Sequence, residues 1–134
     1  MKRLLDINIC IYLIKQKSPG ILQKFRQYQP GDIGVSTITV AELQFGVQNS
    51  QYKTRNAQAL EQFLLPLAIA DFDWAATIAY GQLRAALEQA GQPIGSLDML
   101  IAAHALSLDV TLVTNNTREF ARVPGLSLEN WVEG

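Results

Sequence analysis

The chain has 134 residues, 49% of them hydrophobic and 17% charged, with a net charge of −1. This length is typical of one domain with one core, so we expect a single domain over residues 1–134. Cys10 is the only cysteine, which excludes an internal disulfide, and no apolar run is long enough to span a membrane; we therefore predict a cytoplasmic protein with no membrane partner.

Charge is unevenly distributed along the chain. Residues 1–55 carry eight Lys or Arg against three acidic residues, whereas residues 56–134 carry three against nine. The basic half could face a polyanion, although lysines scattered over solvated helix faces give the same pattern.

The first 65 residues alternate short apolar strands with amphipathic helices. Turn residues at 18–20 and 30–31 separate these elements. The predicted elements are a strand at 4–5, a helix that continues to the break at 18–20, a helix at 21–28, a strand at 33–35, a helix from about 37 to 47 and a helix at 53–65. Ser36, Thr37 and Thr39 offer oxygen atoms that can cap the third of these helices.

The second half continues the alternation. The predicted elements are a strand at 67–70, a helix capped by Asp73 and ending at Gly91, a loop at 92–95, a helix from 97 to about 108 capped by Ser96, and a strand at 110–113. Unbroken apolar strands separated by helices are typical of a parallel sheet covered on both faces. We therefore predict an α/β fold with a central, mostly parallel sheet and helices on both faces.

Three carboxylates lie in apolar stretches of the sequence. Asp6 ends the first strand, Glu42 lies in the opening turns of the helix from about 37 to 47, and Asp98 lies in the first turn of the helix from 97. Ligands of such sheets bind beyond the carboxyl ends of the strands, where these residues and Asn116 should converge. Taken singly, Asp6 could be a helix cap and Asp98 a helix-dipole partner.

Carboxylate and amide oxygens of this kind suit a hard divalent cation. Mg²⁺, or Mn²⁺ in its place, accepts oxygen ligands and keeps several waters, whereas one His and one Cys cannot build a usual zinc site. Such a cation can polarise a phosphodiester and activate water for its hydrolysis. His104 shares the apolar face of its helix, which favours a structural role at the edge of the core over a role as general base, and Arg84 could meet phosphate or lie in solvent.

Four stretches resemble, in order and spacing, the PIN-domain ribonuclease toxins called VapC. The stretches are residues 4–12, 36–46, 93–105 and 113–120, with residues 123–126 and 129–131 adding to the likeness. The resemblance implies a PIN-like fold and a Mg²⁺-dependent endoribonuclease toxin, usually dimeric and held inactive by a VapB-type antitoxin. Transfer RNA is the first substrate that it suggests, and ribosomal RNA the next.

The same resemblance assigns catalytic roles to individual positions. Asp6 and Asp98 would be metal ligands, Glu42 a ligand directly or through water, and Asn116 would take the place where many relatives have a fourth Asp. Asn116 is neutral, and Glu119, one helical turn later, could compensate for the missing charge.

A second departure lies beside the first Asp. Ile7 stands where the family generally has Thr or Ser. A catalytically weak or inactive PIN-like module that acts by binding in a dimeric repressor complex therefore stays open as an alternative. An RNA-maturation or DNA-directed nuclease of the same fold is another.

Overall fold

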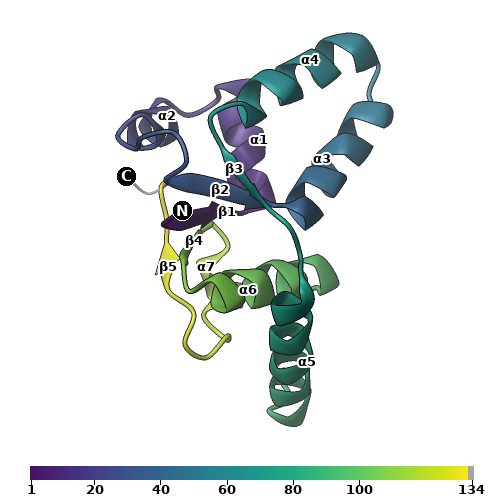
Figure 1. Ribbon diagram of the computed structural model, residues 1–134, viewed down its shortest axis with the longest axis vertical. Helices are drawn as coiled ribbons and strands as arrows, with labels where there is room; N and C mark the ends of the chain where they lie inside the picture. Colours follow the sequence, from purple (N-terminus) through teal and green to yellow (C-terminus); the bar gives the residue numbers. More distant parts are fainter. Residues whose placement is uncertain (133–134) are drawn as a thin grey trace.

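The computed structural model describes residues 1–132 and contains one parallel sheet (Figure 1). Its strands are β1 (Arg3–Leu5), β2 (Ile33–Ser36), β3 (Ala68–Ala70), β4 (Thr111–Val113) and β5 (Leu128–Glu129), in the order β3-β2-β1-β4-β5. All four neighbouring pairs run parallel, which confirms the predicted sheet. The sequence did not predict β5, because two residues are too few to show a strand pattern.

The order of the strands defines where a ligand can bind. From β1 the chain moves outward to β2 and β3 on one side, and it returns on the other side through β4 and β5. In parallel sheets, a crevice opens beyond the carboxyl ends of the strands where the order reverses. Here that position lies between β1 and β4, just after Leu5 and Val113, which are paired in register.

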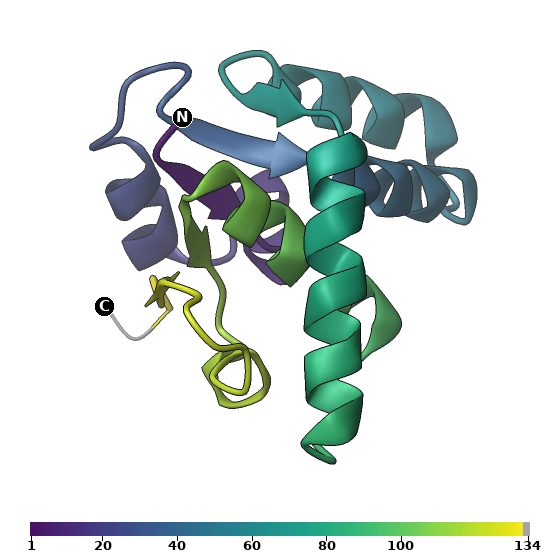
Figure 2. The same cartoon turned by 60° about the horizontal axis from the view of Figure 1, so that its bottom comes forward.

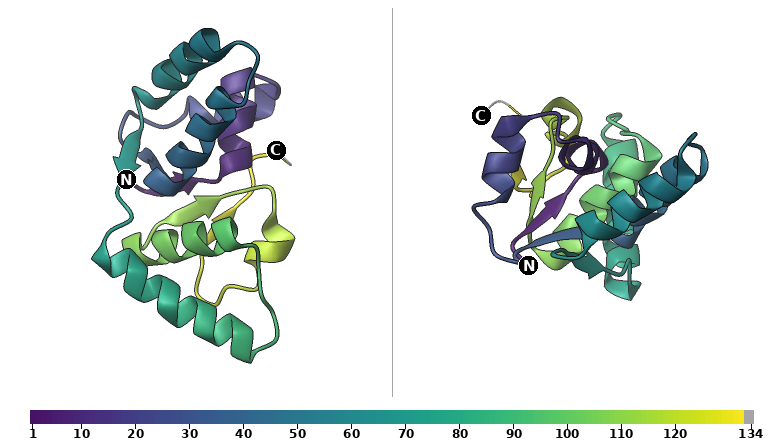
Figure 3. Two further views of the ribbon diagram at one scale, coloured as in Figure 1. Left: turned by 90° about the vertical axis from the view of Figure 1, so that its right-hand side faces the viewer. Right: turned by 90° about the horizontal axis from the view of Figure 1, so that it is seen from above.

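The helices are α1 (Ile7–Lys15), α2 (Pro19–Phe25), α3 (Thr37–Gln48), α4 (Lys53–Leu64), α5 (Trp74–Gln89), α6 (Ser96–Leu108) and α7 (Thr117–Phe120). They cover both faces of the sheet, as predicted: the left view of Figure 3 places α1, α3 and α4 on one side of the strands and α5 and α6 on the other. Helix α5 is long and packs along α6 (Figure 2). No helix within residues 1–132 combines the length and the apolar character needed to span a membrane.

Some helix boundaries differ from the prediction. Helix α1 ends at Lys15, because Gln16 adopts a left-handed conformation with φ of 52°. Helix α2 begins at Pro19, whose fixed φ suits a first helical position. The prediction that Ser96 caps α6 is wrong: Gly95 occupies the N-cap, and Ser96 is the first residue of the helix.

Two apolar cores fill the space between the sheet and its helices. Because successive side chains of a strand point to opposite faces, Leu4 packs with α5, α6 and α7, whereas Leu5 packs with α1, α2, α3 and α4. Leu112 and Val113 divide in the same way on β4. Cys10 lies buried in the second of these cores, as expected for an inert thiol.

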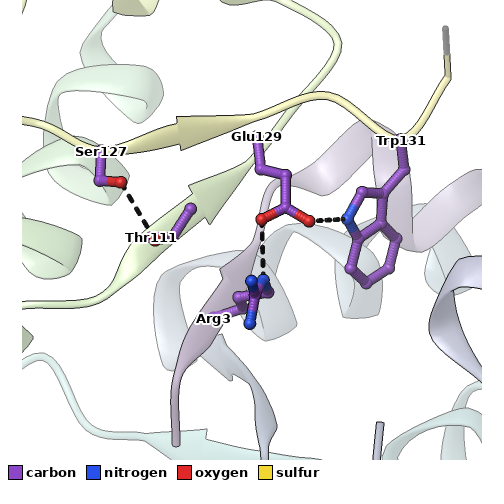
Figure 4. Close-up of polar contacts among 5 residues, drawn as sticks. All are labelled: Arg3, Thr111, Ser127, Glu129 and Trp131. Carbon is purple, nitrogen blue, oxygen red and sulfur yellow. Dashed lines mark hydrogen bonds and ion pairs between the residues drawn. The ribbon is translucent and has the colours of Figure 1, made fainter. Parts of the chain in front are cut away.

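Side chains of β1 and the C-terminal segment join the last strand to the rest of the sheet (Figure 4). Arg3 Nε donates to Glu129 Oε2 at 2.9 Å, and Trp131 Nε1 donates to Glu129 Oε1 at 2.8 Å. The buried Trp131 ring also stacks on Tyr28, with 5.7 Å between the ring centroids. These contacts hold the short strand β5 in place.

Candidate functional site

A cavity of about 530 Å³ opens at the carboxyl edge of the sheet, where the strand order reverses. The four predicted residues Asp6, Glu42, Asp98 and Asn116 all line it. They come from the end of β1, from α3, from the first turn of α6 and from the segment after β4. The structure therefore brings together residues that are more than 100 positions apart.

Asp6 is the most deeply buried of these carboxylates, with 4% of its surface exposed. Its Oδ1 accepts a hydrogen bond from the backbone N–H of Ile7 at 2.7 Å, and its Oδ2 accepts one from the Thr114 hydroxyl at 2.7 Å. Burial raises the pKa of Asp6, and the two hydrogen bonds oppose that rise. Asp6 is thus the helix cap that the sequence allowed and also a wall of the cavity.

Asp98 is half-buried and faces other negative groups. Burial raises its pKa to about 7, and the nearby charges of Glu119 and Asp6 raise it in the same direction. A pKa near 7 means that the metal-free protein holds a proton on this carboxyl in much of its population at neutral pH. The helix-dipole contribution that the sequence suggested is therefore outweighed by burial and by the neighbouring acids.

Glu119 belongs to the same cluster and is more strongly held than the sequence indicated. Its Oε1 accepts a hydrogen bond from Gly95 N–H at 2.6 Å, and its Oε2 accepts one from the Asn116 side-chain amide at 2.9 Å. These bonds lower the pKa of Glu119, and a further hydrogen bond joins it to Asp98. Near neutral pH the shared proton therefore resides on Asp98, while Glu119 stays ionised.

Burial and then the charges of Glu119 and Asp6 raise the pKa of Asp98, so negative charge is crowded around this cavity. Two carboxylates in hydrogen-bond contact repel unless a proton or a cation lies between them. The donors are all oxygens, which fits Mg²⁺ or Mn²⁺ and does not fit zinc. In the arrangement described for residues 1–132, however, no group of three His, Cys, Asp or Glu side chains could hold a metal ion. The residues fit a divalent cation by their chemistry and share one cavity without forming a closed site.

Sequence reasoning missed one functional side chain and gave another a secondary place. Thr114 is not among the residues that the sequence analysis singles out, yet its buried hydroxyl donates to Asp6 and accepts from the Asn116 N–H at 3.0 Å. Its position directly after β4, the strand that pairs with β1, is the feature that could have pointed to a contact with Asp6. Glu119 was considered only as compensation for Asn116, although its spacing of one turn from Asn116 pointed to the site.

Other candidates lie away from the cavity. Arg84 is exposed on α5, bonds to Glu88 and Tyr80 on its own helix and does not line the cavity. His104 is completely buried within the core, not at its edge, and does not line the cavity. Ile7 does line the cavity, so an apolar side chain occupies the wall beside Asp6.

Comparison with known proteins identifies the family. The model of the PIN domain matches residues 3–126. The tRNA(fMet)-specific endonuclease VapC of Shigella flexneri is 43% identical over 131 residues, which cover 98% of each chain. Ribonuclease VapC2 of Rickettsia felis is 45% identical over 129 residues, which cover 96% of each chain. The chain belongs to the VapC family of PIN-domain ribonucleases.

Solved structures of the family share this fold. VapBC2 from Rickettsia felis, bound to a DNA fragment from its promoter, contains a chain that matches with a TM-score of 0.92 and 43% identity over 98% of this chain and 99% of that one. DNA-bound VapBC from Salmonella typhimurium matches with a TM-score of 0.93 and 40% identity over 98% of both chains. The resemblance noted in the sequence and the predicted fold are thereby confirmed.

Proposed function

We propose that this protein is the toxin of a toxin–antitoxin pair and acts as an endoribonuclease that hydrolyses RNA phosphodiester bonds with a divalent cation, Mg²⁺ or Mn²⁺. The observation that carries the proposal is the convergence of Asp6, Glu42, Asp98 and Asn116 on one cavity at the carboxyl edge of the sheet. Transfer RNA is the proposed substrate class, because a relative 43% identical over nearly the whole chain is named a tRNA(fMet)-specific endonuclease. The proposed place of action is the cytoplasm, where this substrate is found.

The chain's own residues would hold the cation and keep the site in shape. Asp6, Asp98 and Glu119 are the proposed charged ligands, with Glu42 binding directly or through water and the Asn116 amide oxygen beside them. When bound, the cation supplies Lewis-acid polarisation of a phosphodiester and acidification of water. Thr114 keeps Asp6 oriented, and Gly95 N–H keeps Glu119 oriented. Because Asp98 carries a proton in much of the metal-free population at neutral pH, cation binding would release that proton.

A second cavity supports a VapB-type antitoxin as the partner. It is a groove of about 460 Å³ between α1, α3 and α4, lined mainly by apolar side chains that include Ile11, Phe45 and Leu60. Ile7 and Glu42 line both this groove and the acidic cavity, so the two are continuous. An apolar antitoxin segment could therefore lie in the groove and extend a basic residue, such as Arg, into the acidic cavity. We also propose that the toxin itself forms a two-fold homodimer, because large apolar side chains such as Trp74 and Ile78 are exposed on its surface.

The decisive experiment is to sequence the 5′ ends of RNA fragments after brief induction of the chain without its antitoxin. Wild type should give new ends at defined positions in a small set of transfer RNAs, and Asp6→Asn should give none. The purified protein should cleave the same RNA with Mg²⁺ or Mn²⁺ and lose cleavage in a chelator. Cleavage that survives both Asp6→Asn and the chelator would contradict the proposal.

The inactive-module alternative rests on Ile7, which replaces the expected hydroxyl beside Asp6. It predicts no RNA ends that depend on Asp6, with antitoxin binding intact. The same sequencing experiment therefore separates the two functions, and defined ends in DNA or in precursor RNA would favour the other nuclease classes.

A further inference from the structure

The two helices that carry Glu42 and Asp98 are joined by one buried polar contact. His104 Nδ1, on α6, lies 2.8 Å from the hydroxyl oxygen of Ser36, the N-cap of α3. Both side chains are completely buried. The same hydroxyl oxygen accepts a hydrogen bond from Ile38 N–H at 3.0 Å, so the contact is made at the first turn of α3.

The hydrogen-bond roles of this contact depend on which ring nitrogen carries the hydrogen. Because Ser36 Oγ already accepts from Ile38, its own hydrogen is free to be donated to Nδ1. If the ring donates instead, the hydroxyl hydrogen has no acceptor in the described contacts, whereas a ring that accepts at Nδ1 carries its hydrogen on Nε2. Burial lowers the pKa of His104 although Asp73 and Asp71 lie near enough to oppose that change, so the neutral ring is favoured.

The other nitrogen of the ring adds no hydrogen bond between the two helices. His104 Nε2 is buried with no hydrogen-bond partner among the described residues. The edge of the ring meets Phe72, with 5.2 Å between centroids and 74° between the planes, and Phe72 N–H donates to the Thr37 hydroxyl at 3.2 Å. The contacts of His104 therefore converge on the first turn of α3.

The contact lies at the same chain distance from two of the site's carboxylates. Glu42 follows Ser36 by six residues along α3, and Asp98 precedes His104 by six residues along α6. At 1.5 Å per residue, each carboxylate lies roughly 9 Å along its helix axis from the contact. A rotation of either helix about this contact would therefore change the separation of the two carboxylates.

We propose that His104 is a positioning residue of the nuclease, which sets the distance between Glu42 and Asp98 through its hydrogen bond with Ser36. The inference rests on the proposed function, because that distance matters only if both carboxylates serve one cation. Since the described residues form no closed metal site, the relative placement of α3 and α6 determines how readily Glu42 reaches the cation. His104 itself touches neither substrate nor metal.

The test uses the purified full chain and its binding of Mn²⁺ in calorimetry, beside RNA cleavage. His104→Phe keeps a ring and removes Nδ1, and we expect it to weaken Mn²⁺ binding about tenfold, at the lower end of losses caused by removing groups that orient metal ligands. His104→Asn places an amide oxygen near the position of Nδ1, whereas His104→Gln places its amide near the position of Nε2. The Asn variant should therefore regain most of the affinity and the Gln variant should not.

Thr39→Val is the matched control. The Thr39 hydroxyl is also buried in the first turn of α3, has no hydrogen-bond partner among the described residues and makes no recorded bond to α6, so its loss should leave Mn²⁺ affinity unchanged. Equal affinity in wild type and the Phe, Asn and Gln variants would overturn the inference. If His104→Phe does not fold, the order of Asn above Gln still decides the matter. No Mn²⁺ binding by wild type would instead contradict the proposed function.

Discussion

The proton on Asp98 links the stability of this protein to pH. The pKa of Asp98 rises from an ordinary value of 3.8 to about 7 in the folded chain. Between these values the native state holds a proton that the unfolded chain has released, so stability falls as pH rises through this range and the loss is complete above pH 7. The lowered pKa of Glu119 acts in the opposite sense, but only below its ordinary value of 4.5.

Asp98→Asn should therefore raise the thermal unfolding midpoint of the chelator-treated protein by a few degrees at pH 8 and change it little at pH 4. The neutral amide imitates the protonated carboxyl and removes the penalty for ionisation. Circular dichroism melts at pH 4, 6 and 8 measure the effect, with Asp109→Asn as an exposed control outside the cavity. Parallel pH profiles in the variant and wild type would show that Asp98 ionises without cost.

The beginning of α6 contributes to the site through its backbone. Gly95 is the N-cap, with φ of −57°, and its N–H is held by Glu119. Proline adopts a similar φ but has no N–H, and its ring would occupy the position toward which that bond points. Gly95→Pro should therefore displace the Glu119 carboxylate and weaken Mn²⁺ binding about tenfold.

Gly95→Ala is the matched control for this element. A Cβ at Gly95 would lie 3.5 Å from Asp98 Oδ2 and 3.6 Å from Glu119 Oε1, which are ordinary contacts, and the N–H stays. Calorimetric titration of both variants gives the comparison. An equal loss of Mn²⁺ affinity in the Ala variant would mean that the added bulk at this position, and not the loss of the hydrogen bond, weakens Mn²⁺ binding.

Among the helices and strands, the sequence predicted those that show a periodic apolar pattern and missed features that depend on contacts with distant residues. The strands around Leu4 and Leu112 and the helices on both faces follow from apolar patterns. Strand β5 forms because Glu129 meets Arg3 and Trp131, which no local pattern encodes. The cap of α6 was misread for a similar reason: Ser96 has the usual chemistry of a cap, yet Gly95 takes that place, where Glu119 binds its N–H.

For the site, the sequence predicted which residues come together but not the contacts between them. Asp6, Glu42, Asp98 and Asn116 line one cavity because parallel strands share an edge, and that could be inferred from chain order. The proton shared by Asp98 and Glu119 depends on distances of a few ångströms between α6 and α7, which the order of elements does not define.

At the scale of the whole molecule, the apolar groove and the acidic cavity should be separable by mutation. Phe45 lines the groove and has 62% of its surface exposed. Phe45→Asp should weaken binding of the antitoxin at least tenfold, because a charge in an apolar interface stays desolvated and unpaired. RNA cleavage by the free toxin should change little, since Phe45 does not line the acidic cavity.

Leu65→Asp is the control for this prediction, because Leu65 is 74% exposed and lies outside the groove. Binding of the purified antitoxin, followed by calorimetry beside a cleavage assay, measures both properties in each variant. If the antitoxin fully inhibited the Phe45→Asp variant at the same concentration that inhibits the wild-type toxin, the antitoxin would have to bind outside the groove.

The pairing of β1 with β4 has a consequence for the synthesis of the protein. Asp6 is made more than 100 residues before Val113, to which its N–H bonds, and Thr114, to which its carboxylate bonds. During translation the acidic cleft therefore cannot assemble until the segment after β4 has left the ribosome. The proposed nuclease site is thus incomplete until that point, whereas the α1 surface that contributes to the apolar groove emerges long before.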